Sequence, residues 1–158
     1  MGLVFFIIKL MSFILFCKSQ IISPIFGEKQ FNENILNLIS SANKSIHATI
    51  YKFNNNNFID TFRQLGNSGV QLNLYCDKES FDTCNKFFKF GNIEKFSMKS
   101  YSKLHAKSIL IDQQILILGS FNLDNSGFSS NMEIGVVLRD DNLIYEYKLF
   151  LQNLKNNQ

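Results

Sequence analysis

His105 and Lys107 are the residues whose types and spacing most directly suggest covalent chemistry. They lie in an apolar run from Leu104 to Ile111 that predicts a β-strand. Residues two apart on a strand project from the same face, about 7 Å from each other. An imidazole nitrogen can attack phosphorus while an ammonium group neutralises the non-bridging oxygens. The pair therefore suits a reaction at phosphate, although a His and a Lys on one strand are weak grounds by themselves.

A second apolar run, residues 114–118, follows the first after two residues and predicts a hairpin. It ends at Gly119, which permits a sharp backbone turn. Ser120 and Asn122 come next and carry side-chain hydrogen-bond donors that suit a phosphate. If the two strands pair, we expect these donors to return to the neighbourhood of His105.

The spacing of these residues resembles the HKD motif of the phospholipase D superfamily. The motif has six specified positions within 18 residues, and they read His105-x-Lys107-x4-Asp112-x6-Gly119-Ser120-x-Asn122. The run 131–133, Asn-Met-Glu, stands where the family has a later Asn-x-Glu. Residues 45–77 are similar to the family's opening strand, helix and Gly-Val strand. The resemblance therefore covers nearly everything after residue 30.

The resemblance implies a role for each polar residue of the motif. His105 would be the nucleophile and form a phosphohistidine intermediate that water then hydrolyses. Lys107 and Asn122 would bind the phosphate, with help from Ser120. Glu133 would accept a hydrogen bond from His105 and so fix the tautomer of the imidazole.

The resemblance implies structural roles for Asp112, as an ion-pair partner, and for Gly119. The mechanism it implies uses no metal ion and no other cofactor. Cys17, Cys76 and Cys84 show no metal-ligand spacing. Pairing of Cys76 with Cys84 stays open for an exported protein, but the apolar surroundings of Cys76 favour a buried, unpaired thiol.

The family normally has two HKD motifs, because a second imidazole must protonate the leaving oxygen. This chain has one motif. His47 is the only other histidine and lacks a lysine two residues on, so we interpret it as a strand histidine. The resemblance therefore implies a symmetric homodimer in which His105 of each subunit faces one phosphate.

The pattern of helices and strands predicts an α/β fold: a mixed β-sheet sandwiched by helices, as in the phospholipase D family. Helical spacing predicts helices near residues 31–42, 58–65, 81–90 and 143–154, the second with Asn57 as its N-cap. Strands are predicted at 45–53, 70–76, 104–111, 114–118 and 132–138. We expect one phosphodiesterase domain over residues 28–158, after a linker at 23–27.

Residues 1–22 are predicted to be a signal peptide or an N-terminal membrane anchor. The run 3–16 is nearly all apolar but is shorter than the roughly 20 residues of a membrane span. It suits a signal peptide with a cut before Gln20. The protein is accordingly expected to be secreted or periplasmic, or membrane-anchored, rather than cytoplasmic.

Composition and charge leave the substrate open. A hydrophobic fraction of 46% and a charged fraction of 18% exclude a disordered protein, while a net charge of +3 says little about partners. Six lysines nevertheless fall close together around the motif, opposed in that window only by Glu94, and could meet an anionic substrate: Lys86, Lys89, Lys95, Lys99, Lys103 and Lys107.

Three functions compete. A phospholipid hydrolase is favoured by the apolar N-terminus, by the many phenylalanines and by the pair Leu123–Asp124, which resembles the cardiolipin-synthase-like branch of the family. Against this, Ser126 stands where that branch often has arginine. The lysine run favours a non-specific endonuclease that follows a DNA or RNA backbone without a metal ion. A non-catalytic binding module is the third reading, and the intact motif disfavours it because a binder needs no nucleophile.

Overall fold

Seven strands form one mixed sheet in the computed structural model, which describes residues 19–23, 28–98 and 101–156. The strands are β1 (Ser19–Ile22), β2 (Ser45–Ile50), β3 (Gln71–Cys76), β4 (Gly91–Lys95), β5 (Ser108–Ile111), β6 (Ile115–Gly119) and β7 (Gly135–Leu138). Their order across the sheet is β1-β7-β6-β5-β2-β3-β4. β2, β3 and β4 are parallel, whereas every other neighbouring pair is antiparallel.

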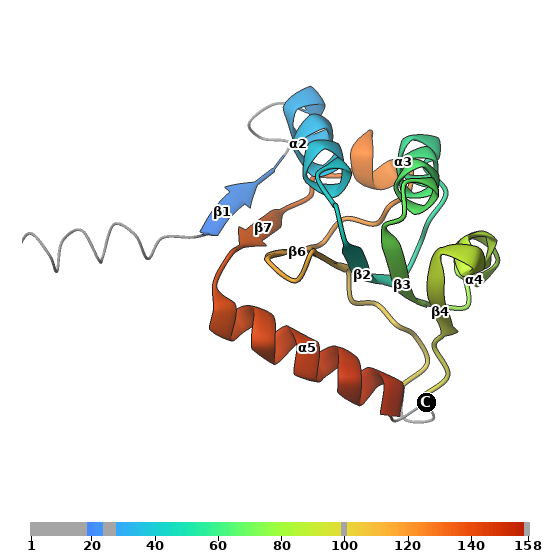
Figure 1. The fold of residues 1–158 in the computed structure, drawn as a ribbon. Helices are drawn as coiled ribbons and strands as arrows, with labels where there is room; N and C mark the ends of the chain where they lie inside the picture. The colour runs from blue at the N-terminus through green and yellow to red at the C-terminus, as the bar shows by residue number, and fades with distance from the viewer. Residues whose placement is uncertain (1–18, 24–27, 99–100, 157–158) are drawn as a thin grey trace, which may run out of the picture.

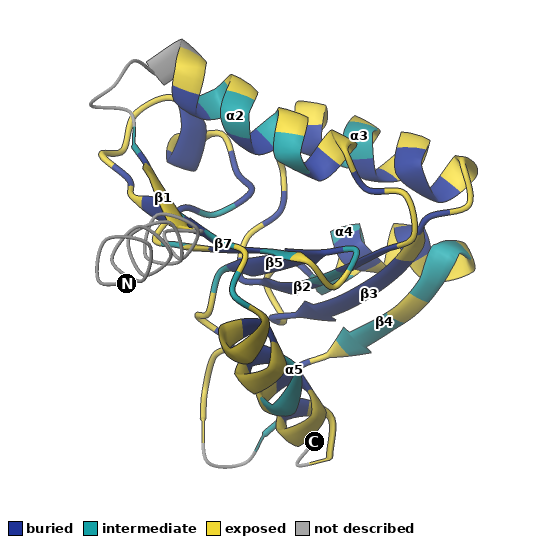
Figure 2. Ribbon diagram, turned by 60° about the vertical axis from the view of Figure 1, so that its left-hand side comes forward, coloured by how far each residue is buried: buried dark blue, intermediate teal, exposed yellow. Residues whose placement is uncertain are grey.

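Helices cover both faces of this sheet, as the sequence predicted (Figures 1 and 2). The helices are α2 (Glu28–Ser40), α3 (Asn56–Asn67), α4 (Phe81–Cys84) and α5 (Asp141–Asn156), with 3-10 turns at η2 (Asn85–Phe90) and η3 (Ser126–Phe128). α2 and α3 lie on one face and α5 lies on the other (Figure 2). The predicted α/β class and the helix–sheet–helix layering are confirmed.

The packing follows from the spacing of apolar residues. In α3, Phe58, Phe62 and Leu65 recur at three- and four-residue intervals, so they share one face and are buried against the sheet. Burial of a phenylalanine of this kind stabilises the fold by roughly 1.5–3 kcal/mol. On the opposite face, Ile144 and Leu151 of α5 join a second apolar cluster with the sheet.

The two strands predicted around the motif form the expected hairpin, because β5 and β6 pair in an antiparallel ladder. Residues 112–114 connect them, and Asp112 and Gln113 have φ values of 50° and 59°. Positive φ at both central residues of the turn, which the bond from the Gln114 N–H to the Ile111 carbonyl closes, is typical of a type I′ turn.

Several predicted elements differ from the structure, among them the strand expected at 132–138, which begins only at Gly135. The strand expected from residue 104 begins only at Ser108, because the Leu104 N–H is bound by the Asp77 carboxylate at 2.7 Å instead of by a neighbouring strand. The N-cap of α3 is Asn55, whose side chain accepts from the Asn57 N–H, and not Asn57 itself. Strand β4 was not predicted, since it carries a single apolar side chain on a half-exposed edge.

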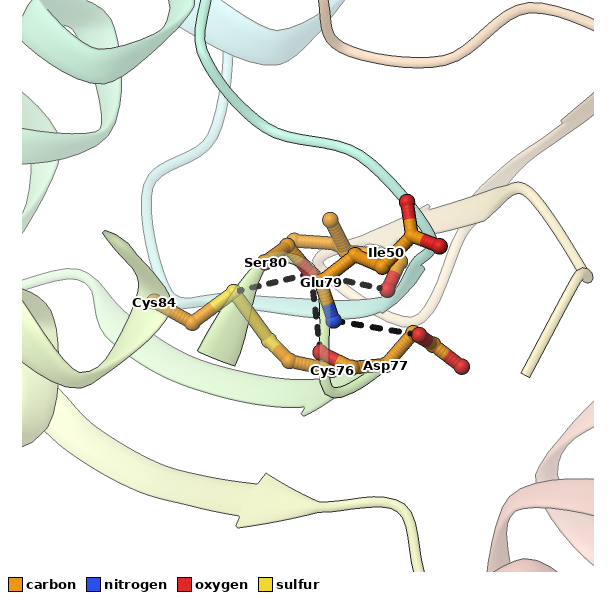
Figure 3. Close-up of a disulfide and its surroundings, with 6 residues drawn as sticks. All are labelled: Ile50, Cys76, Asp77, Glu79, Ser80 and Cys84. Carbon is orange, nitrogen blue, oxygen red and sulfur yellow. Dashed lines mark hydrogen bonds between the residues drawn. A yellow bond between two sulfur atoms is a disulfide. The ribbon is translucent and has the colours of Figure 1, made fainter. Parts of the chain in front are cut away.

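Cys76 and Cys84 form a disulfide, so the favoured interpretation of Cys76 as an unpaired thiol is wrong (Figure 3). The chain turns back after β3, and Asp77 accepts the Glu79 N–H while Ser80 bonds to the backbone of Ile50. This turn brings α4 next to the end of β3 and places the Cα atoms of Cys76 and Cys84 6.7 Å apart. The spacing of the two cysteines alone did not reveal it.

Part of the range assigned to a signal peptide or anchor belongs to the sheet. Residues Ser19–Ile22 form β1, which pairs with β7, and Ile22 is buried. Residues 1–18 and 24–27, which hold the apolar run and most of the predicted linker, lie outside the described residues. None of the described helices has the length and apolar character needed to cross a membrane.

Candidate active site

The polar residues of the motif gather at one edge of the sheet because of its topology. β2 and β6 end at this edge, and β5 and β7, which run antiparallel to β6, begin there. The segment with His105 and Lys107 precedes β5, Ser120 and Asn122 follow β6, and Glu133 precedes β7. The backbone joins two of these segments directly, since the Gly119 N–H donates to the Lys107 carbonyl at 3.2 Å.

His105 and Lys107 touch, although they do not lie on a strand as predicted. The Lys107 Nζ atom is 2.9 Å from Nδ1 and 3.1 Å from Nε2 of His105, and it donates to the His105 carbonyl at 2.8 Å. The irregular segment before β5 therefore folds the ammonium group back onto the imidazole, where regular strand spacing would hold the two apart. The His105 side chain is exposed at the surface of the site.

Glu133 does not bond to His105, contrary to the expectation from the family. Its carboxylate is buried and accepts from the Ser120 hydroxyl and, at 3.1 Å, from the Asn131 amide. Ser120 in turn accepts the Ile134 N–H at 3.1 Å. Because the single O–H donor of Ser120 is used on Glu133, it is not available for a phosphate in this arrangement.

Lys107 and Asn122 line a small cavity behind the site together with Tyr51 and Lys52. The Asn122 Oδ1 atom is buried and has no hydrogen-bond partner among the described residues. Buried polar atoms in folded proteins are nearly always satisfied, so this orphaned oxygen marks a place where a donor such as an ordered water belongs. A phosphate oxygen accepts hydrogen bonds, so binding of a phosphate would need the Asn122 Nδ2 group and not Oδ1.

The charge on Lys107 is incompletely compensated. Burial lowers the pKa of its ammonium group below the ordinary value, the nearby charges of Glu133 and Asp124 raise it in part, and the charge of Lys52 lowers it further. A phosphate bound beside Lys107 would supply the missing negative charge.

Position 119 requires glycine because neighbouring segments lie too close to it for a side chain, and not because its backbone angles are unusual. A Cβ atom there would collide with the Phe121 ring and lie 2.9 Å from the Ile134 carbonyl. The glycine therefore lets the end of β6 pass close to the start of β7, where Ser120 meets Glu133.

Asp112 is structural, but its partners are backbone amides and not the expected cation. Its carboxylate accepts the N–H groups of Asn43, Lys44 and Ser45 at 2.8–2.9 Å. Burial raises the pKa of this carboxyl group, but the three N–H groups and the Lys44 charge outweigh it, so the net shift is downward. The residue ties the hairpin turn to the start of β2, at the opposite end of β5 from His105.

His47 lies away from the site, in agreement with its interpretation as a strand histidine. It pairs in β2 with Leu110 of β5 and lines a cavity beneath α5 with Lys148. Burial lowers the pKa of His47, and the Lys148 charge lowers it further. No second imidazole therefore reaches His105 within the described part of this subunit.

Sequence reasoning missed Tyr51, Asp77 and Glu79. The Tyr51 ring lies 4.5 Å from the His105 ring, centroid to centroid, and its hydroxyl donates to Glu79. Asp77 holds the Leu104 N–H. The sequence held a signal for two of them, because Tyr51 and Asp77 directly follow two parallel strands. The carboxyl ends of parallel strands meet at the same edge of a sheet, where sites commonly lie.

The described side chains contain no group of three or more histidines, cysteines or acids arranged to hold a metal ion. What they do contain is an exposed imidazole, an ammonium group in contact with it, a buried amide and a carboxylate. This set can present a nitrogen nucleophile to a phosphate and neutralise the phosphate oxygens.

Comparison with known proteins matches residues 35–155 to the family described as "Cardiolipin synthase, PLD-like domain". A mitochondrial cardiolipin hydrolase of Chlamydomonas reinhardtii is 27% identical over 117 residues, which are 72% of this chain and 52% of the relative. Cardiolipin synthase 1 of Staphylococcus epidermidis is 26% identical over 128 residues, 76% of this chain and 26% of the relative. The chain thus spans about half of the first relative and a quarter of the second.

Two solved structures share the fold over nearly their whole length. Nuc from Salmonella typhimurium, a phospholipase D family member, has a TM-score of 0.73 at 21% identity, over 88% of this chain and 94% of that one. NucT from Helicobacter pylori has a TM-score of 0.74 at 19% identity, over 89% and 96%. At these identities the likeness speaks for the architecture alone.

Proposed function

The chain belongs to the phospholipase D superfamily of phosphodiesterases, and on that premise we propose that it hydrolyses the phosphodiester bonds of phospholipids through a phosphohistidine on His105. One observation carries the proposal. The Lys107 ammonium contacts the exposed His105 imidazole beside a cavity that Asn122 also lines. A nucleophile and a cation thus meet at one place.

The chemistry proceeds in two displacements. A His105 nitrogen attacks phosphorus, so that a P–N bond forms while the P–O bond to the leaving alcohol breaks. A second imidazole gives its proton to the leaving oxygen and then takes a proton from the water that cleaves the P–N bond. Lys107 and Asn122 hold the non-bridging oxygens through both steps.

We propose that the second imidazole is His105 of another subunit in a symmetric dimer. The described part of one subunit brings no other histidine to the site, since His47 lies beneath α5. Apolar side chains are also exposed beside Glu133: Met132 is 74% and Ile134 is 52% accessible, and Leu118 and Ile21 are exposed on the neighbouring strands. An exposed apolar surface next to an incomplete site is the kind of surface that a second subunit covers.

The dimer proposal predicts that Met132→Glu gives an inactive monomer, because a charge would be buried in the subunit contact. Sedimentation velocity should show a dimer for the wild-type chain and a monomer for the variant. Glu146→Lys, an exposed change on α5, is the control and should stay dimeric and active. A wild-type protein that is monomeric and fully active would contradict the proposal.

Phospholipid as the substrate is supported by the names of the relatives. The Chlamydomonas reinhardtii relative is named a cardiolipin hydrolase, and the Staphylococcus epidermidis relative is named a cardiolipin synthase.

A metal-independent endonuclease is the second candidate, and the lysines around Tyr51 favour it. The ammonium groups of Lys52, Lys103 and Lys107 lie 5.8, 5.6 and 5.1 Å from the centre of the Tyr51 ring. Three cations at one aromatic ring could follow a nucleic-acid backbone on either side of the cleaved phosphate. A binding module without activity is the third candidate, and the contact between His105 and Lys107 disfavours it.

One assay separates the candidates. The purified full chain is incubated, with a chelator present, with cardiolipin vesicles, phosphatidylcholine vesicles and plasmid DNA. We expect phosphatidic acid from the vesicles and intact supercoiled plasmid. Nicked plasmid without lipid turnover would instead identify the endonuclease, and no turnover of any substrate would support the binding module.

Export or membrane tethering remains our proposal for the location of the protein. The Cys76–Cys84 disulfide supports it, because disulfides persist in oxidising compartments and are rare in the cytosol. Cleavage before Gln20 would leave Gln20, Ile21 and Ile22 to pair with β7.

A further inference from the structure

Tyr51 supports the imidazole of His105. The two ring centroids lie 4.5 Å apart and the ring planes are inclined by 59°. Tyr51 directly follows β2 and is only 8% exposed, whereas His105 is exposed, so the tyrosine is the fixed partner of this contact. We propose that Tyr51 is a positioning residue that holds the His105 imidazole in the orientation needed for attack on phosphorus, an inference that rests on the nucleophilic role proposed above.

The other contacts of His105 do not set its orientation. Lys107 Nζ lies at nearly the same distance from both ring nitrogens, 2.9 and 3.1 Å, so it does not select one of them. A lysine side chain is also flexible and donates only, whereas a buried aromatic ring is rigid. Among the described residues no carboxylate bonds to the imidazole, since Glu133 is bound to Ser120 and Asn131.

Tyr51 is anchored at both of its ends. Its hydroxyl donates to the Glu79 carboxylate at 3.1 Å and accepts from Lys103 at 3.4 Å. The carbonyl of the preceding residue, Ile50, accepts from the Asp77 N–H at 2.8 Å and from the Ser80 hydroxyl at 3.2 Å. With its backbone and its hydroxyl both held, the ring has little freedom to tilt.

A single loop holds both partners of the contact. Figure 3 shows this loop between Cys76 and Cys84, with Glu79 and Ser80 projecting from it and the disulfide joining its ends. The same loop binds the segment of the nucleophile, because the buried Asp77 carboxylate accepts the Leu104 N–H at 2.7 Å. The loop therefore sets the position of the Tyr51 ring relative to the residue next to His105.

The positioning role predicts a specific kinetic effect. Without the ring, the imidazole can rotate out of line with phosphorus, and a misplacement of about 1 Å can reduce the rate about 100-fold. Phosphate binding should change little: Lys107 loses its contact with the Tyr51 ring but keeps its bond to the His105 carbonyl, and Asn122 is unaltered. A loss in kcat at constant KM is the signature of an interaction that acts in the transition state.

The test compares Tyr51→Leu with Tyr51→Phe in the full chain, with bis(4-nitrophenyl) phosphate as a general phosphodiester probe. We expect Tyr51→Leu to lower kcat about 100-fold with KM unchanged, and Tyr51→Phe, which keeps the ring, to lose much less. Tyr145→Leu is the matched control, because Tyr145 is an exposed aromatic residue on α5, and it should retain the wild-type kcat. Wild-type kcat in Tyr51→Leu, or a change confined to KM, would overturn the proposal.

A second readout does not depend on activity. The ring current of Tyr51 should shift the proton resonances of the His105 imidazole upfield in the wild type and in Tyr51→Phe, and the shift should vanish in Tyr51→Leu. If it is absent from the wild type, Tyr51 does not contact His105 and the inference is wrong. A wild-type protein that shows the shift but cleaves no phosphodiester contradicts the proposed function instead.

Two milder variants decide the matter if Tyr51→Leu does not fold. Glu79→Ala removes the bond that the Tyr51 hydroxyl donates, and Tyr51→Phe removes that bond together with the one from Lys103, so Tyr51→Phe should lower kcat by a small factor at least as large as that of Glu79→Ala. The double variant should lose no more than Tyr51→Phe alone, because the two residues act through one contact. If both single variants keep the wild-type kcat, the hydroxyl of Tyr51 does not hold its ring in place for catalysis, and the proposal is wrong.

Discussion

Replacing His105 with alanine is expected to abolish phosphodiester hydrolysis, with a fall in kcat of about 10⁴-fold or more. The reason is that the P–N bond of the intermediate cannot form without the imidazole, and Lys107 has no lone pair to offer while it is protonated. Hydrolysis of bis(4-nitrophenyl) phosphate by purified wild-type and variant protein measures the effect.

His47→Ala provides a matched control, because it removes the other histidine of the chain from a position beneath α5. It should leave the rate close to that of the wild type. The phosphoenzyme gives a second measure: a radiolabelled diester, quenched during turnover, should leave an acid-labile label on the wild type and none on His105→Ala. A label that survives in His105→Ala, or equal rates for both proteins, would show that the nucleophile lies elsewhere.

Replacing Asp112 with alanine is expected to lower the free energy of unfolding by about 2 kcal/mol, without any contact with the substrate. Three backbone N–H groups lose a charged acceptor, and bonds of this kind contribute roughly 1.5–3 kcal/mol each when buried. The partial exposure of the site reduces that sum because water replaces some of the lost interaction. Urea denaturation followed by circular dichroism measures the change.

Acid should remove the advantage of the wild type over Asp112→Ala. The folded-state pKa of Asp112 lies below its ordinary value of 3.8, so the carboxylate stabilises the fold fully above about pH 4 to 5. The difference between the two proteins should be constant near neutral pH and shrink as the pH falls through 3.8 toward the lower folded-state pKa. Gln64→Ala, an exposed change on α3 at a residue that does not titrate, should show no such dependence. A difference that grows toward acid pH would mean that the sign of the shift is wrong.

The identity of the fold and of the motif could be predicted from the sequence because both depend on local order. Periods of two and of about 3.6 residues distinguish strands from helices, and the alternation of these elements indicated a mixed sheet between helices. The short connection between two apolar runs predicted the hairpin, and the motif's spacing alone placed His105, Lys107 and Asn122 among the residues to consider.

The partners of these residues were decided by the tertiary structure. Glu133 bonds to Ser120 instead of His105, and Asp112 bonds to backbone amides instead of a cation, because each carboxylate binds the donors that a neighbouring segment brings to it. The pairing of Cys76 with Cys84 likewise depends on a turn held by contacts to β2.

His105 and Lys107 show most clearly which features the sequence determined and which the tertiary structure decided. Their identity and spacing were visible in the sequence, which marked them for chemistry at phosphate. Their contact was not, because it arises where Asp77 takes the Leu104 N–H and the strand begins only at Ser108, so that Lys107 folds back and the imidazole lies against Tyr51. Sequence order determines which groups are near along the chain, whereas the meeting of strand ends from distant segments determines what each group touches.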